Sequence, residues 1–168
     1  LIEEFGKELN IKPDYSSSYY EDLTYRISAN DIRTALGSDV VVVGGTVPAG
    51  FVPEDVSENV KRYEFGLEMK PTPLYMEVVK CPLADATTIK DVEEYNFPDA
   101  YAAGRFVKAE RDIKKYKESH FIIGDCELSL FELAWHLVGM EKYMMDFAME
   151  EEWIEKLNDK VEEWTLGL

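Results

Sequence analysis

In this 168-residue sequence, the side chains that most readily take part in chemistry are those of the histidines and cysteines. His136 lies within an apolar stretch, where an imidazole either moves a proton near neutral pH or satisfies a buried hydrogen bond. Zinc sites draw on closely spaced ligand pairs, and neither Cys81 nor Cys126 belongs to one, so the sequence predicts no metal site. We expect reduced thiols in a cytoplasmic protein.

Acidic residues and glycines form a second group of candidates. Asp125 and Glu127 follow an apolar strand and precede a predicted helix, where their carboxylates bind substrate, ligate a metal ion or favour the helix dipole. Gly44 and Gly45 end another apolar strand, and without side chains they let a bulky group approach the backbone closely. Glu77 lies in a predicted strand, pointing either into a cavity or to water. The catalytic candidates are Asp125, Glu127 and His136, and the substrate-binding candidates are Gly44, Gly45 and Glu77.

Two predicted strands, in which polar and apolar residues do not alternate, end at several of these candidates. Val40–Val43 and His120–Asp125 are typical of strands buried on both faces of a parallel sheet. Helices are predicted at residues 19–36, 88–94, 98–116, 129–139, 140–149 and 150–164, a loop at 46–61, and a hairpin of strands 61–69 and 74–79. This alternation predicts an α/β fold, whose active sites lie at the carboxyl ends of the strands.

Several helix boundaries are marked by particular residues. Ser28 with Asp31, and Ser129 with Glu132, have the spacing of capping boxes. Thr88 is placed to cap a short helix, and Pro98 stands where it would begin a long one.

The net charge excludes two classes of function. With 18 basic and 34 acidic residues, the chain carries −16 and repels both phosphate backbones and anionic lipid. The basic residues between 105 and 117 alternate with acids, which indicates a solvated helix face. Val40–Val43 is far shorter than the roughly 20 residues that a membrane span needs. We therefore expect no nucleic-acid or membrane partner.

Four segments carry a likeness to a known family: Asn30–Val43, Cys81–Ala86, Glu94–Asp99 and Phe131–Glu141. They resemble the uroporphyrinogen decarboxylase superfamily, and most closely its branch of corrinoid-dependent methyltransferases. The resemblance implies a (β/α)₈ TIM barrel, of which residues 1–168 form a partial barrel, the N-terminal half. In that branch the C-terminal half, here a missing partner, holds a zinc ion that activates a thiol. The resemblance implies no cofactor within this chain, and a corrinoid (cobalamin), carried on a protein, as substrate.

Two departures from the family bear on the reaction. True decarboxylases place an aspartate after the strand that Val40–Val43 resembles, and this chain has Gly44, Gly45 and Thr46 there. Their tyrosine in the later helix is replaced by His136, and their arginine-rich loop is not seen, unless it precedes the first residue. We therefore expect methyl transfer between a corrinoid and a thiol. The alternatives are uroporphyrinogen decarboxylation and a non-catalytic interaction domain.

A half-barrel leaves strand edges and apolar surface without a partner. We therefore expect residues 1–168 alone to be catalytically silent and to self-associate.

Overall fold

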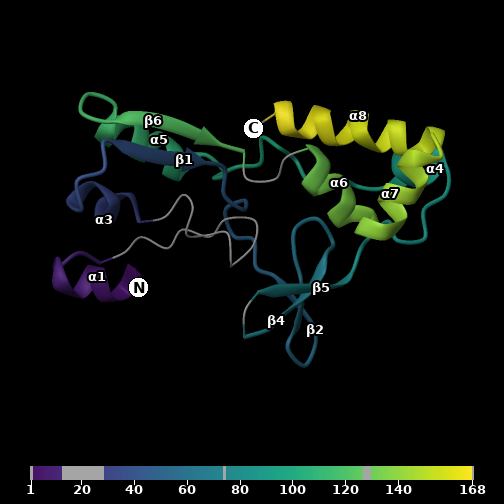
Figure 1. The fold of residues 1–168 in the computed structure, drawn as a ribbon, viewed down its shortest axis with the longest axis horizontal. Coiled ribbons are helices and arrows are strands. Elements are labelled where there is room, and N and C mark those ends of the chain that lie inside the picture. The colour runs from purple at the N-terminus through teal and green to yellow at the C-terminus, as the bar shows by residue number, and fades with distance from the viewer. Residues whose placement is uncertain (1, 13–28, 74, 127–129, 168) are drawn as a thin grey trace. The chain divides into compact units, whose positions relative to one another are not determined.

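The computed structural model describes residues 2–12, 29–73, 75–126 and 130–167 (Figure 1). They form a mixed α/β fold with one parallel and one antiparallel sheet, and the described strands do not close into a barrel. Contacts between residues divide the chain into two compact units, residues 1–49 with 103–127 and residues 50–102 with 128–168. No helix among the described residues combines the length and the apolar character needed to cross a lipid bilayer.

The first unit is built around two short parallel strands. Its elements are α1 (Ile2–Glu8), α3 (Asn30–Ala35), β1 (Val40–Gly44), α5 (Val107–Tyr116) and β6 (Phe121–Asp125). The pairing of β1 with β6 aligns Val40 with Phe121 and Gly44 with Asp125. Both strands and their parallel direction are as the sequence predicts, and α5 packs against β1 (Figure 1).

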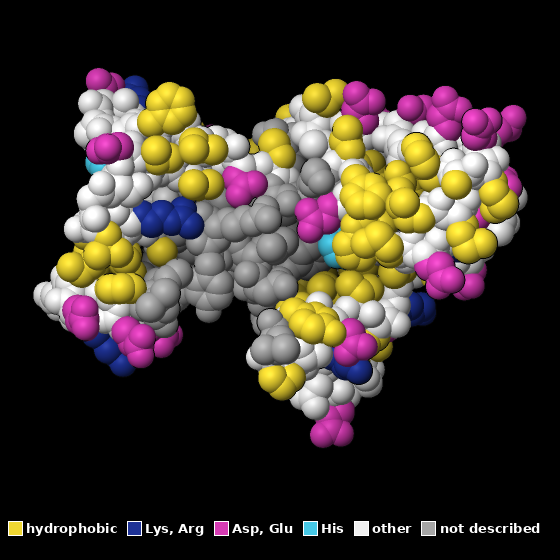
Figure 2. All heavy atoms as spheres, in the orientation of Figure 1, with side chains coloured by type: hydrophobic (Ala, Val, Ile, Leu, Met, Phe, Trp, Pro, Cys, Tyr) yellow, Lys and Arg dark blue, Asp and Glu magenta, His cyan; other side chains and the backbone are white. Residues whose placement is uncertain are grey.

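The two faces of this sheet differ in how they are covered. Side chains alternate along a strand, and Val41 and Val43, which are 0% and 7% exposed, point to the face on which α5 packs. On the other face Phe121 is 71% exposed and Ile123 is 43% exposed. Figure 2 shows hydrophobic side chains gathered over β1 and β6. The prediction of burial on both faces is therefore wrong for β6, because the described residues leave one face of this strand uncovered.

Side chains close the outer edge of β1. This strand bonds to β6 through its odd-numbered positions, because the carbonyl of Asp39 accepts from the first N–H of β6. Val40 and Val42 therefore direct their backbone groups outward. The amide of Asn30 accepts from the Val42 N–H (3.1 Å) and donates to the Val42 carbonyl (2.8 Å). The hydroxyl of Ser38 accepts from the Val40 N–H (3.2 Å) and donates to its carbonyl (2.8 Å).

The outer edge of β6 is different. By the same alternation, Ile122 and Gly124 direct their N–H and C=O groups away from β1. Within the described residues, no hydrogen bond reaches these groups. Side chains thus close one edge of the parallel sheet, and no described segment pairs with the other edge.

The second unit combines an antiparallel sheet with a group of helices. Its strands are β2 (Glu54–Ser57), β3 (Val60–Arg62), β4 (Glu68–Pro71) and β5 (Met76–Lys80), which pair in that order. Its helices are α4 (Ile89–Glu94), α6 (Leu130–Val138), α7 (Met140–Ala148) and α8 (Glu152–Leu166). Helix α8 contacts the other three helices. It buries the apolar face that its sequence predicts: Trp153, Ile154, Leu157, Val161 and Trp164.

The predicted strand at residues 61–69 is wrong, because the chain reverses within it. Gly66 has a φ of 74°, and its N–H donates to the carbonyl of Tyr63 (2.8 Å). β3 and β4 therefore pair with each other across this turn. The predicted loop at 46–61 is also partly wrong, since it contains β2, whose four residues are all exposed and show no apolar pattern. The hairpin of β4 and β5 is confirmed.

One predicted helix start is wrong. Helix α5 begins at Val107 and not at Pro98, because Gly104 has a φ of 89° and lies against Ala49, where a Cβ would come within 2.6 Å of the Ala49 Cβ. A continuous helix cannot pass through such a residue. Helix α3 follows Ala29, which has a φ of 63° and makes no side-chain cap.

Of the three predicted N-cap residues, the described part of the chain includes Thr88. Thr88 and Asp91 form a complete capping box at the start of α4. Ser28 and Ser129 lie outside the described residues.

Candidate functional site

The candidate site lies at the carboxyl ends of β1 and β6, in the first unit. Gly44 and Asp125 are register partners there, so the sequence correctly predicts that they share one edge. Gly45, which follows β1, is buried. Ligands of parallel α/β sheets bind at this edge, because the loops and helix N-termini that follow the strands converge there.

The segment that leaves β1 is fixed to the chain before α5. The N–H and hydroxyl of Thr46 both donate to the carbonyl of Arg105, at 2.9 and 3.0 Å. The guanidinium of Arg105, which is 0% exposed, donates to the carbonyl of Thr46 (2.9 Å). The backbone N–H of Ala49 donates to the carbonyl of Ala103 (2.8 Å). These bonds hold the exit of β1 rigidly beside the N-terminus of α5.

A small cavity of about 280 Å³ opens between these segments. Its polar lining comes from Thr46 and from Lys108 and Arg111 of α5. No acidic residue is among the side chains that line it. The cavity therefore presents positive charge near the carboxyl end of β1, which suits an anionic group on a ligand.

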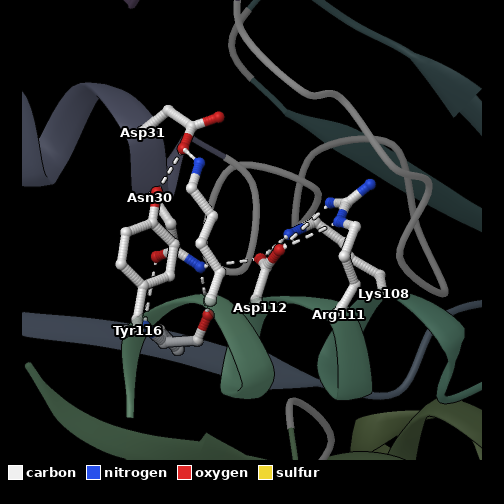
Figure 3. A network of polar contacts seen from close by, with 8 residues as sticks. Asn30, Asp31, Lys108, Arg111, Asp112 and Tyr116 are labelled. Carbon is white, nitrogen blue, oxygen red and sulfur yellow. Dashed lines mark hydrogen bonds and ion pairs between the residues drawn. The ribbon is translucent and has the colours of Figure 1, made fainter. Parts of the chain in front are cut away.

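Asp112 holds the two cations in place (Figure 3). One of its oxygens accepts from the ammonium of Lys108 (2.5 Å) and from the amide of Asn30 (3.1 Å). The other accepts from the guanidinium of Arg111 at 3.1 Å. The side chains of Lys108 and Asp112 are 8% and 6% exposed, so this pair is buried. Both cations that line the cavity therefore pair with the same carboxylate.

A second carboxylate in the same network joins α3 to α5. Asp31 accepts hydrogen bonds from Lys115 and Tyr116 (Figure 3). Burial opposes ionisation of Asp31, but these two bonds and the charge of Lys115 outweigh it and hold the pKa of the carboxyl below its usual range. The same pairing raises the pKa of Lys115.

The charge of Asp125 acts on a half-buried arginine of α3, Arg33. Burial lowers the pKa of the Arg33 guanidinium, and the negative charge of Asp125 opposes that change. The carboxylate at the end of β6 therefore contributes negative potential within this unit. The site thus has an acidic group at one strand end and a positively charged cavity beside the other.

The remaining predicted site residues lie elsewhere. His136 belongs to α6 of the second unit, is 9% exposed, and stacks on the ring of Trp135 with 3.8 Å between the ring centroids. Glu77 of β5 pairs with Lys70 across the hairpin, at 3.1 Å from Nζ to Oε2. Glu127 lies outside the described residues. Of the six candidates, the structure brings Gly44, Gly45 and Asp125 together.

The two thiols differ in exposure. Cys81 is half-buried, and burial raises the pKa of its thiol, whereas Cys126 is exposed. In the part of the chain that the structure describes, no three His, Cys, Asp or Glu side chains are grouped so that they could hold a metal ion.

The basic residues of α5 are the part of the site that the sequence interpretation missed. Together with Arg105 just before α5, they are interpreted from the sequence as a solvated helix face, which is wrong for Arg105 and Lys108 because both are buried. The spacing of Lys108 and Asp112, one helical turn apart, is a signal of their ion pair. Burial of that pair depends on the tertiary contact with Asn30, which local spacing does not reveal.

Comparison of the chain with protein-family models, with curated proteins and with solved structures found no match.

Proposed function

We propose that this chain is the N-terminal half of an enzyme that resembles the uroporphyrinogen decarboxylases, and that the whole enzyme transfers a methyl group between a corrinoid and a thiol. The observation that carries the proposal is the alignment of Gly44 with Asp125 at the carboxyl ends of two parallel strands. Neighbouring strands of a (β/α)₈ barrel have this direction, and barrel active sites lie at this end. The four family-like segments support the same assignment.

The uncovered face of the sheet supports a barrel. In such a fold α5 lies outside and the opposite face points to the packed interior, so Phe121 and Ile123 would become interior residues. The open edge of β6 would receive the third barrel strand. At the outer edge of β1, the side chains of Asn30 and Ser38 would give up their hydrogen bonds to the β1 backbone. The peptide groups of the last barrel strand would replace those bonds.

The chemistry at the strand ends favours methyl transfer over decarboxylation. Gly44 and Gly45 offer no carboxylate to a ring of pyrrole N–H donors. Lys108 and Arg111 would hold an anionic group of the methyl acceptor, which orients its sulfur. From the sequence, His136 is the candidate to accept the proton that the thiol loses when its sulfur bonds to the methyl group. A zinc ion, which the resemblance assigns to the other half, would stabilise the thiolate.

Two anaerobic reactions test the proposal, with protein expressed from the reading frame continued beyond Leu168. One contains a methylated corrinoid and a thiol, and the other contains uroporphyrinogen. We expect thiol-dependent demethylation in the first, at a rate at least about tenfold lower in His136→Ala and unchanged in His120→Ala. Formation of coproporphyrinogen in the second reaction would instead establish decarboxylation.

A non-catalytic interaction domain is the second candidate, and the exposed apolar face of β6 favours it. The reading frame also discriminates here. A stop codon directly after Leu168, with no turnover in either reaction, would support this candidate against the enzyme.

A further inference from the structure

The second unit contains a larger cavity that the proposed function does not use. It lies between the segment at residues 92–101 and the end of α8 and has a volume of about 630 Å³, within the range of small-molecule sites. Four aromatic side chains contribute to its lining: Tyr95, Phe97, Tyr101 and Trp164.

Three of these rings are held by neighbours. The hydroxyl of Tyr95 donates to the carbonyl of Phe65 (2.6 Å), and the ring of Phe97 meets the Tyr95 ring edge to face, at 4.8 Å and 81°. Trp164 is 5% exposed, and its ring meets that of Phe65 at 4.8 Å and 75°. Two rings at nearly a right angle, with a third anchored beside them, form a preorganised aromatic wall.

Tyr101 supplies the outer ring of the cavity. It is 75% exposed, and its backbone N–H donates to the side chain of Asp99 (2.8 Å). Its ring lies beside Gly167, where an added Cβ would be 3.5 Å from the ring. An exposed ring held beside a cavity remains available to a ligand.

The charges that line the cavity are mainly negative. Glu93 and Glu163 contribute to the lining, and Lys160 is the one basic residue among the residues that line it. Lys160 donates to Glu163 (2.8 Å), and this bond lowers the pKa of Glu163, which therefore stays ionised at neutral pH. Glu93 pairs with Lys156 of α8, with 3.9 Å between Nζ and Oε1, so both carboxylates of the lining have a lysine beside them, in a protein of net charge −16.

We propose that this cavity binds a small organic cation that carries a quaternary ammonium group. The faces of aromatic rings attract such a cation, and water hydrates a quaternary ammonium too weakly to compete strongly. The net charge of −16 adds to the attraction for a cation and disfavours an anion of the same size. This site is independent of the strand ends at which the proposed reaction takes place.

Isothermal titration calorimetry with choline and with 3,3-dimethylbutan-1-ol tests the proposal. The alcohol has the same shape, with a neutral carbon in place of the nitrogen, so the comparison isolates the charge. We expect choline to bind about fivefold more tightly, or better. Equal affinities, or no binding of choline at about 10 mM, would overturn the proposal.

Matched variants locate the binding. Tyr101→Leu retains an apolar side chain but removes the outer ring, and we expect it to weaken choline binding about threefold or more. Tyr75→Leu changes another exposed tyrosine, outside the cavity, and should bind choline as the parent chain does. Choline affinity that is the same in the parent chain and in Tyr101→Leu would show that the cation binds elsewhere and would contradict the assignment.

Discussion

Asp112 shows how one residue organises the buried charges of the first unit. It neutralises Lys108 inside the fold, orients Arg111 and receives the amide of Asn30. A buried ion pair adds little over an apolar pair of the same size, but removal of one partner leaves a buried charge without compensation.

We therefore expect Asp112→Ala to lower the free energy of unfolding by about 3–5 kcal/mol. Urea denaturation followed by circular dichroism measures this change. Asp159→Ala removes an exposed carboxylate and should change stability by about 0.5 kcal/mol or less. Similar losses in the two variants would show that the Asp112 network is not a source of stability.

Asp31 makes stability depend on pH in the acid range. Its folded pKa is lowered, so its contribution is present above the unfolded pKa of about 3.9 and is lost as pH falls through the folded value. Asp31→Asn removes the contribution at every pH. We expect the stability difference between parent and variant to be constant above about pH 5 and to shrink as pH falls below that value through the folded pKa, as measured by denaturation at each pH. A difference that is constant with pH would contradict this role.

At the scale of elements, the strands and helices with strong local signals are predictable from the sequence. β1, β6, α4 and α8 follow from apolar runs, a capping box and a one-sided apolar stripe. The strand predicted at 61–69 fails because alternate residues from Tyr63 to Met69 are buried although the chain turns at Gly66. Alternating apolar residues indicate which side chains are buried, but this pattern does not distinguish a strand from a turn. Here the positive φ of Gly66 makes the difference.

The edge of β1 depends on one side chain. Asn30→Ala would remove two bonds to Val42 and one to Asp112, and we expect a loss of about 1–3 kcal/mol in stability. Hydrogen exchange should also become faster at the Val42 amide. Asn96→Ala, at an exposed position, is the control and should change neither quantity. An unchanged exchange rate at Val42 in the Asn30 variant would show that the edge is not closed by this side chain.

At the scale of the whole molecule, the sequence predicts the α/β class and the edge shared by Gly44 and Asp125. It does not predict the cavity beside Thr46, because that cavity arises where the exit of β1 meets α5, far away in the chain. Bonds between distant segments have no local pattern. The role of Asn30 cannot be predicted for the same reason. Its side chain takes the place of a neighbouring strand only because the fold brings it beside Val42.

The open sheet predicts association of the chain with itself. The exposed apolar residues of β6 lie beside an edge that no described strand pairs with, so we expect residues 1–168 to form dimers or larger species as concentration rises. Ile123→Lys places a charge on this face and should shift the distribution toward monomers in sedimentation velocity. Leu36→Lys alters another exposed apolar residue of the same unit and should not. A monomeric parent chain at about 100 μM would contradict the prediction.

The central claim is that β1 and β6 are neighbouring strands of a barrel completed by further chain. Amide hydrogen exchange at Ile122 and Gly124 tests it most directly, with residues 1–168 compared to the protein continued beyond Leu168, both at concentrations where they are monomeric. We predict rapid exchange of both amides in the shorter chain and protection at least about 100-fold greater in the longer one, with Val42 protected in both. Equally rapid exchange of Ile122 and Gly124 in the two proteins would contradict the barrel.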